Sequence, residues 1–497
     1  MRKPFPTAVA AIFLALVACK IPVPPAGGDI LSPGARSKIP VGWSGRHGGG
    51  AVVPNWITTF NDPELTRLVA DAVARNPDLA VAAAKVEASR AAVRVAAASL
   101  YPRVGGKGLG ERQQREIIGR SGLNIDPPDL GGTGVDNSGG SADTSSADDS
   151  SGRWVTGIAI GASWEADVWG RVRSKKAAAV AESAALEADY QFARQSLAAA
   201  VARAYFSTIE ASQQAANARE TLGLYEDYLN LTGIRKDQGH ASDFDMSQIR
   251  SRTAGARDTI HTAEAARAQS IRAIEVITSH YPAGNLTTRT TFPGQPKTVP
   301  AGMPSQILER RPDILAAEYR VAAAFHRVTE ARAARLPRFA LSAVNGIGTA
   351  QLDGVGTLDA VNWSLAAGVT QPIFFGGELK AAEDIRTAEQ KASAYAYTST
   401  ALRAFEDVED ALANEYYLGL REASLSDMVE QSGSAANLGR LQLDQGQTDM
   451  FVILRLVSEN LAAKVQLTQI RASRLRERVN LHLALGGDFK GTGAPSK

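Results

Sequence analysis

The chain has 497 residues, of which 44% are hydrophobic and 21% are charged, so it is too apolar to be disordered throughout. Its 54 Lys and Arg residues nearly balance its 52 Asp and Glu residues, which argues against a nucleic-acid partner. The single cysteine excludes an intramolecular disulfide and a metal site built from several cysteines.

The N-terminal segment 1–18 has the pattern of a bacterial signal peptide. A basic start precedes an unbroken apolar stretch at 8–18, which is too short to cross a bilayer. The stretch ends in Leu-Val-Ala-Cys, with the cysteine at position 19, and this resembles a bacterial lipoprotein cleavage site. We expect Cys19 to carry lipid and Lys20 to favour the outer membrane. Ordinary cleavage, with Cys19 left as a free thiol, is the alternative.

Two segments that lie far apart in the sequence are copies of each other. Pro-Asp-Leu-Ala from Pro77 recurs as Pro-Asp-Ile-Leu from Pro312, and the same spacing pairs Pro102 with Pro337. Proline suits the first turn of a helix and ends a helix at the residue before it. Each copy therefore predicts a helix that begins at the first proline and ends before the second, and the chain is expected to contain one unit twice.

After each proline stop the hydrophobic period changes to two, which predicts strands. We expect strands at about 101–111 and 154–165, and again at about 337–348 and 361–374. A stretch rich in Gly, Ser and Asp predicts a mobile loop at 112–153. Six aromatic residues near the strand ends favour an interfacial belt, with ordinary core positions as the alternative. They are Trp154, Trp164, Trp169, Trp363, Phe374 and Phe375.

Long helical patterns follow each pair of strands, at about 174–236 and 379–445. At 1.5 Å per residue these helices are roughly 90–100 Å long. A glycine turn and a returning helix follow each, at about 243–280 and 449–484. Alanine-rich interiors indicate closely packed antiparallel coiled coils, and the arginine-rich stretch 471–478 is predicted to be a solvated or interprotomer face.

The predicted fold class is mainly α with a small membrane β part, in two internal repeats. Four short strands cannot close a barrel, and lipid does not tolerate an open sheet edge. Outer-membrane barrels begin at about eight strands, so more than one copy of the chain must contribute. We divide the sequence into a signal peptide 1–18, an extended tether 19–55, a first repeat 56–290, a second repeat 291–486 and a flexible tail 487–497.

The motifs resemble those of outer-membrane efflux proteins of the TolC type, and with Cys19 those of the NodT-type lipoprotein branch. The likeness covers about 56–486. The segments that carry it are 164–171, 201–206, 371–377 and 404–412. It implies a homotrimer with a twelve-stranded barrel and a helical periplasmic tunnel in the outer membrane of a Gram-negative bacterium. It also implies a passive exit duct that works with a periplasmic adaptor and an inner-membrane pump.

In this family the coiled helix tips close the tunnel, and the matching segments here are 243–249 and 449–456. Asp245 falls on a family gate carboxylate, whereas Arg455 stands where the family often has an acid. Our hypothesis is that Asp245–Arg455 pairs close the gate and make the mouth less cation-selective. Asp243 and Asp449 lie at the same tips, where they are gate candidates or, alternatively, helix N-caps.

The sequence predicts no enzyme, cofactor or metal site. Its six histidines are scattered, and it has no phosphate-binding loop and no Gly-x-Ser-x-Gly motif. A periplasmic coiled-coil adaptor and a structural outer-membrane lipoprotein remain as alternative functions. The duplication and the amphipathic strands argue against the adaptor, and the absence of any catalytic constellation weakens the reading as a structural or enzymatic lipoprotein.

Overall fold

The computed structural model describes residues 22–31, 39–40, 42–46, 48–114, 152–294, 298–352 and 356–487. The signal peptide, Cys19, most of the predicted loop 112–153 and nearly all of the tail lie outside the described residues. The chain divides into two units. The strand unit contains Val95–Arg173 and Glu330–Lys380, and the helical unit contains Pro22–Arg94, Ser174–Thr329 and Ala381–Lys497.

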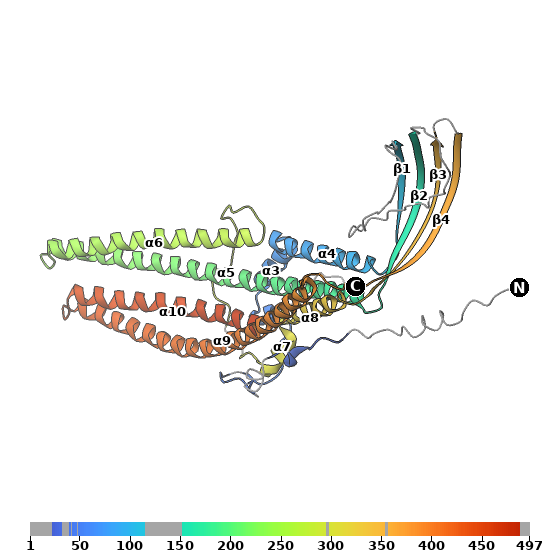
Figure 1. The fold of residues 1–497 in the computed structure, drawn as a ribbon. Helices are drawn as coiled ribbons and strands as arrows, with labels where there is room; N and C mark the ends of the chain where they lie inside the picture. The colour runs from blue at the N-terminus through green and yellow to red at the C-terminus, as the bar shows by residue number, and fades with distance from the viewer. Residues whose placement is uncertain are drawn as a thin grey trace. The chain divides into compact units, whose positions relative to one another are not determined.

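The strand unit contains one antiparallel sheet in the order β1-β2-β3-β4 (Figure 1). The strands are Arg103–Gln114, Gly152–Ala166, Arg338–Leu352 and Gly356–Thr370. They lie where the alternation predicts them but run further into the loops, because the ladder pairing continues beyond the apolar residues, as between Gln114 and Gly152. The ends of the predicted mobile loop are therefore strand. β4 ends at Thr370 rather than 374, before Pro372, since proline cannot donate to a ladder.

The repeats are visible in matched helix lengths. The short helices α4 (Pro77–Ala98) and α8 (Pro312–Ala333) have 22 residues each. The long helices α5 (Arg171–Asp237) and α9 (Glu378–Asp444) have 67 residues each. The connection from β1 to β2 is longer than that from β3 to β4. For this reason α4 and α8, which precede the strands, are separated by more residues than α5 and α9, which follow them.

Each long helix turns at a glycine and returns as a helix of 35 residues, α6 (Asp243–Ile277) or α10 (Met450–Ala484). In Figure 1 α6 runs beside α5, and α10 runs beside α9. Side chains also join α10 to α5, since the Tyr225 and Ser458 hydroxyls lie 2.9 Å apart. The Asn460 amide donates to the Val429 carbonyl of α9 at 2.9 Å. α10 therefore packs between α5 and α9.

Shorter elements that the sequence analysis did not identify complete the helical unit. They are η1 (Gly27–Asp29), η2 (Trp56–Phe60), α3 (Pro63–Arg75), η3 (Pro304–Gln306) and α7 (Ile307–Arg310). Asp62 caps α3 by accepting from the amides of Glu64 and Leu65, and Pro63 occupies its first turn, as favourable caps require. Trp56 and Phe60 lie in a core cluster with residues of α3, α5, α6 and α10.

The prediction that 19–55 is only a tether is wrong for its later part. Trp43 is buried in a core cluster, and its indole N–H donates to the Ala301 carbonyl at 3.2 Å. Glu409 on α9 accepts from the amides of Ser44 and Gly45 at 2.8 and 3.0 Å. These partners lie hundreds of positions away, so the local composition does not indicate them.

The prediction of a solvated face holds only in part for the arginines at 471–478, because the side chain of Arg471 is 44% exposed and that of Arg478 only 3%. They form ion pairs inside the chain, with carboxylates of α9 and α5. The pairs are Arg471–Glu422, Arg474–Glu422, Arg478–Glu415 and Arg476–Glu210. Arg478 is buried, and a buried cation requires such a partner. These pairs therefore link α10 to both long helices.

Candidate functional site

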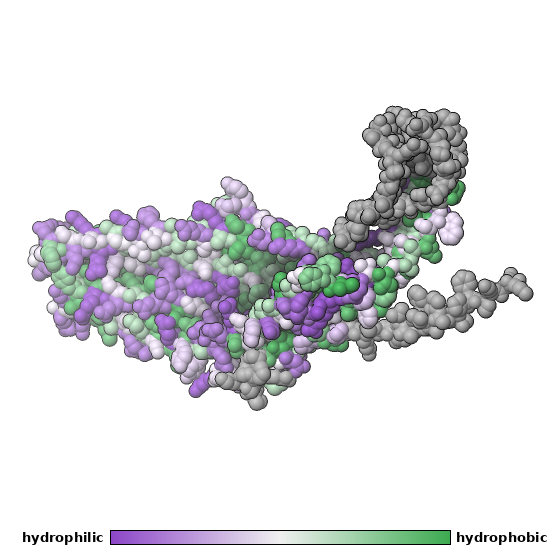
Figure 2. All heavy atoms as spheres, viewed as in Figure 1, coloured by the Kyte–Doolittle hydropathy of each residue, from purple (hydrophilic) through white to green (hydrophobic). Residues whose placement is uncertain are grey.

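One face of the sheet is apolar and exposed. Ile158, Ile347 and Val361 lie side by side on neighbouring strands, and all three are exposed. Trp363 on β4 is 78% exposed. Figure 2 shows hydrophobic residues on the visible part of the sheet that no grey atoms cover. A sheet in water normally buries its apolar face, so this face requires an apolar environment.

The aromatic residues at the strand ends are not ordinary core residues. Trp164 and Trp169 are partly exposed, and their indole N–H groups donate to the carbonyls of Leu100 and Pro337 at 2.9 and 2.8 Å. Phe374 is 86% exposed. The core alternative is therefore wrong for these residues, and the same holds for Trp363 and Phe375. The side chain of Trp154 is outside the described part of the structure.

The motif at 164–171 builds the corner between β2 and α5. Asp167 accepts from the amides of Val172 and Arg173, both at 2.9 Å, which satisfies the free N–H groups at the start of α5. Arg171 donates two hydrogen bonds to Glu165 at 3.0 and 2.7 Å. The polar residues of the motif thus hold the turn from strand to helix.

At the tip of the first hairpin, Ser242 is the N-cap of α6 and not Asp243. Ser242 has an extended backbone, and its hydroxyl accepts from the Asp245 amide at 3.2 Å. The Asp245 carboxylate accepts from the Ser242 amide and hydroxyl, each at 2.7 Å, and these bonds lower the pKa of Asp245. The alternative that made Asp243 an N-cap is therefore wrong. Asp243 lies in the first turn, 2.5 Å from the Lys236 ammonium, which lowers its pKa.

The second tip differs. Asp449 is the N-cap of α10 and accepts from the Phe451 amide at 3.1 Å, so the capping alternative is confirmed for this residue. The Arg455 side chain is 71% exposed and lies 3.9 Å from Glu459. No Asp245–Arg455 ion pair occurs within the described part of the chain. Arg455 and Arg252 instead line one cleft of about 280 Å³.

A contact that the sequence analysis missed joins the two tips. The rings of Phe244 and Phe451 lie 5.6 Å apart. Both residues lie in the first turn of a returning helix. The number of residues between them in the sequence equals that between the first residues of α6 and α10, so they occupy equivalent positions of the two repeats. That repeated spacing is the signal that could have revealed the pair.

The described residues contain no group of three or more His, Cys, Asp and Glu side chains that could hold a metal ion. Within the same ranges, no helix is both long enough and apolar enough to cross a membrane.

Comparison with known proteins identifies the class. The model of the outer membrane efflux protein family matches residues 68–279 and 303–487. The toluene efflux pump outer membrane protein TtgF of Pseudomonas putida is 31% identical over 437 residues, covering 88% of this chain and 85% of the relative. The pyoverdine export outer membrane protein OpmQ, also of Pseudomonas putida, is 30% identical over 482 residues, covering 96% of each.

The outer-membrane channel OprN is similar in structure, with a TM-score of 0.77 and 25% identity, covering 95% of this chain and 99% of that chain. The chain therefore belongs to the outer membrane efflux protein family. It is an outer-membrane component of an efflux system, in a family of channels rather than enzymes. The expected family, the mainly helical two-repeat fold and the exit-duct function are confirmed, and the adaptor and structural-lipoprotein alternatives are not supported.

Proposed function

We propose that three copies of the chain form one passive exit duct, with twelve strands in a shared barrel and a tunnel of long helices in the periplasm. Small molecules enter at the helix tips, where a periplasmic adaptor and an inner-membrane pump dock. The observation that carries this proposal is the four-stranded sheet, in which β1 and β4 each pair on one side only among the described residues, while the exposed face is apolar. Pairing β4 of one copy with β1 of the next removes every open edge.

The helical unit supports the same assembly. α9 exposes a series of large apolar side chains along its length. They are Ile385, Tyr395, Leu402, Tyr417, Leu420, Met428, Leu438 and Leu441. Apolar side chains in a continuous series mark a protein interface. In a closed ring, this surface of α9 lies against α6 of the neighbouring copy.

The assembly is tested on the full mature chain purified in detergent. We expect a trimer by size and single channels in planar bilayers that are small and rarely open. Leu402→Glu on α9 is expected to lower the trimer fraction at least about tenfold, because it buries an unpaired charge between copies. Ala216→Glu on an exposed position of α5 is the matched control and should remain trimeric. A wild-type monomer without conductance would contradict the shared barrel.

We propose further that the tips gate the duct. Asp243, Asp245 and Asp449 hold the turns, and Arg455 points a cation from each copy toward the constriction. This assignment is supported by the exposure of Arg455 and by its long distance to Glu459. In the trimer, Arg455 pairs with Asp245 of a neighbouring copy. Both hydrogen bonds from Ser242 to the Asp245 carboxylate use Oδ2, so Arg455 pairs with the other oxygen, Oδ1.

The gate is tested by reversal potentials of Arg455→Asp channels in asymmetric salt. A ring of charge at a constriction sets ion preference, so we expect a shift toward cations and more frequent opening. Arg403→Asp, at an exposed position of α9 away from the tip, is the control for charge alone. An unchanged anion-to-cation preference in the Arg455 variant refutes the gate assignment.

Lipid attachment at Cys19 and the division into two repeats at 56–290 and 291–486 complete the proposal. The lipoprotein-like sequence before Cys19 supports the first. The intact mass of the mature chain should include acyl chains, and Cys19→Ser should lack them. An unacylated wild-type chain would show that the cysteine is not a lipid anchor.

A further inference from the structure

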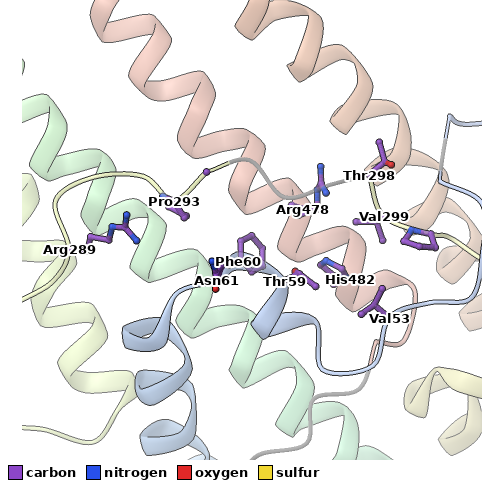
Figure 3. Close-up of a pocket in the computed structure, with 12 residues that line it drawn as sticks. Val53, Thr59, Phe60, Asn61, Arg289, Pro293, Thr298, Val299, Arg478 and His482 are labelled. Atoms are coloured by element: carbon purple, nitrogen blue, oxygen red, sulfur yellow. The ribbon is translucent and has the colours of Figure 1, made fainter.

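The helical unit contains a cavity of about 570 Å³ near the end of α10, a size typical of small-molecule sites. Three segments that are far apart in the sequence line it (Figure 3). Phe60 and Asn61 come from the segment around η2, Arg289 and Val299 from the connector between the repeats, and His482 from α10. The proposed duct function uses none of these residues.

His482 is the unusual member of this lining. Its side chain is 1% exposed, and its ring stacks on Trp56 with centroids 5.6 Å apart. Neither ring nitrogen has a hydrogen-bond partner among the described residues. Burial, and then the nearby Arg478 charge, lower the pKa of His482 to about 3. The neutral ring carries one donor and one acceptor, and because its two nitrogens point in different directions, one small polar group can pair with only one of them.

The equivalent residue of the first repeat shows how this position is normally satisfied. Glu275 occupies the place in α6 that His482 occupies in α10, and it is also buried. Its carboxylate accepts from the amides of Gly284, Asn285 and Leu286 at 2.7, 2.8 and 3.0 Å. The first repeat thus satisfies its buried polar group with its own backbone, whereas the second leaves it facing a cavity.

Two cations and an apolar wall complete the lining. Arg289 is 3.6 Å from Asp62, and Arg478 pairs with Glu415, but neither carboxylate lines the cavity. A guanidinium has five N–H donors, so each can hold a carboxylate on one side and bind a second anion on the other. Phe60 and Val299, with neighbouring prolines, provide apolar surface.

We propose that this cavity binds a small organic anion that carries a carboxylate, a hydroxyl group and an apolar ring. Arg478 binds the carboxylate, one ring nitrogen of His482 forms a hydrogen bond with the hydroxyl group, and the ring packs on Phe60 and Val299. The ligand ties the connector and the segment around η2 to α10, and therefore stabilises the helical unit. This site is independent of conduction through the duct.

The test uses the full mature protein in detergent and 4-hydroxybenzoate as the probe, with calorimetric titration and thermal unfolding. We expect saturable binding and a rise in Tm. Benzoate lacks the hydroxyl group and 4-hydroxybenzyl alcohol lacks the charge, so each should bind about tenfold more weakly. Inorganic phosphate alone should give a smaller shift. No saturable binding, or an equal effect from phosphate, overturns the proposal.

Variants of the cavity sharpen the result. His482→Phe keeps a ring on Trp56 but removes both nitrogens, so we expect at least about a tenfold loss of affinity and an unliganded Tm that is no lower than that of the wild type. Arg478→Gln should weaken the carboxylate contact to a similar degree. His261→Phe, at an exposed position of α6, is the matched control and should bind normally. Unchanged affinity in His482→Phe overturns the assignment of His482 to the binding site, even if the arginine variant is unstable. The comparison of ligands uses the wild-type protein, so it does not depend on the folding of any variant.

Discussion

The two returning helices α6 and α10 have the same length but very different surroundings. Of their 35 residues each, 7 are buried in α6 and 15 in α10. The long helices differ in the complementary way, since α5 exposes two large apolar residues, Val180 and Ile234, whereas α9 exposes eight. α10 has neighbours on both sides within its own chain, through contacts such as Tyr225–Ser458 and Asn460–Val429.

This difference teaches that duplication preserved element lengths but not environments. α6 contacts α5 through surface ion pairs such as Arg257–Glu226, which contribute little stability when exposed. Both helices contribute to the same core clusters, but α10 contributes more residues to them than α6 does. We therefore expect changes in α10 to unfold the chain, and changes on α6 and the exposed surface of α9 to affect assembly.

The largest expected effect concerns a pair of repeat-equivalent positions. Ile453 on α10 is fully buried, and Met246 occupies the same place on α6 but is only half-buried. Ile453→Ala should cost about 2–4 kcal/mol of unfolding free energy, and Met246→Ala about 1 kcal/mol, because a deeper cavity remains in the first case. Denaturant unfolding followed by circular dichroism measures both, and equal losses would contradict the comparison.

The next effect is a pH dependence that separates the equivalent residues Glu275 and His482. Both have a lowered pKa in the folded chain. Each therefore stabilises the fold above its unfolded pKa, and this stability is lost as the pH falls. His482 lowers the stability first, as the pH falls from about 6.5 to about 3, because the unfolded chain gains a proton on this residue that the folded chain does not. Glu275 lowers the stability only below about pH 4.5.

Between pH 6.5 and 4.5 we expect His482 to reduce stability by up to about 1.4 kcal/mol per pH unit. His482→Phe should remove this slope in thermal melts recorded across the same range. A variant whose pH profile matches that of the wild type would show that another group dominates.

The smallest effect distinguishes the two helix caps. Ser242→Ala removes the hydroxyl of the capping box at the first tip and should cost about 1 kcal/mol. Asp449→Asn at the second tip should change stability by less than about 0.5 kcal/mol, since asparagine caps as well as aspartate. Hydrogen exchange of the first turns of α6 and α10 would measure both. A larger loss at Asp449 would indicate that its charge has a role beyond capping.

The sequence by itself determined the repeated architecture, because the signals involved are local. Pro77 and Pro312 begin helices, Pro102 and Pro337 end them, and alternating apolar residues define the strands. The same local signals could not select Ser242 over Asp243 as the cap of α6. Both residues suit that position, and the backbone conformation of the turn decides between them.

Only the tertiary structure decided which faces are covered. Trp43 is buried because it meets Ala301, a residue of the distant connector, and the arginines of α10 are paired because α9 and α5 bring carboxylates to them. His482 stands beside a cavity for the same reason, since its lining comes from three distant segments. Periodicity specifies which face of a helix is apolar, but the partner of that face depends on how distant segments pack.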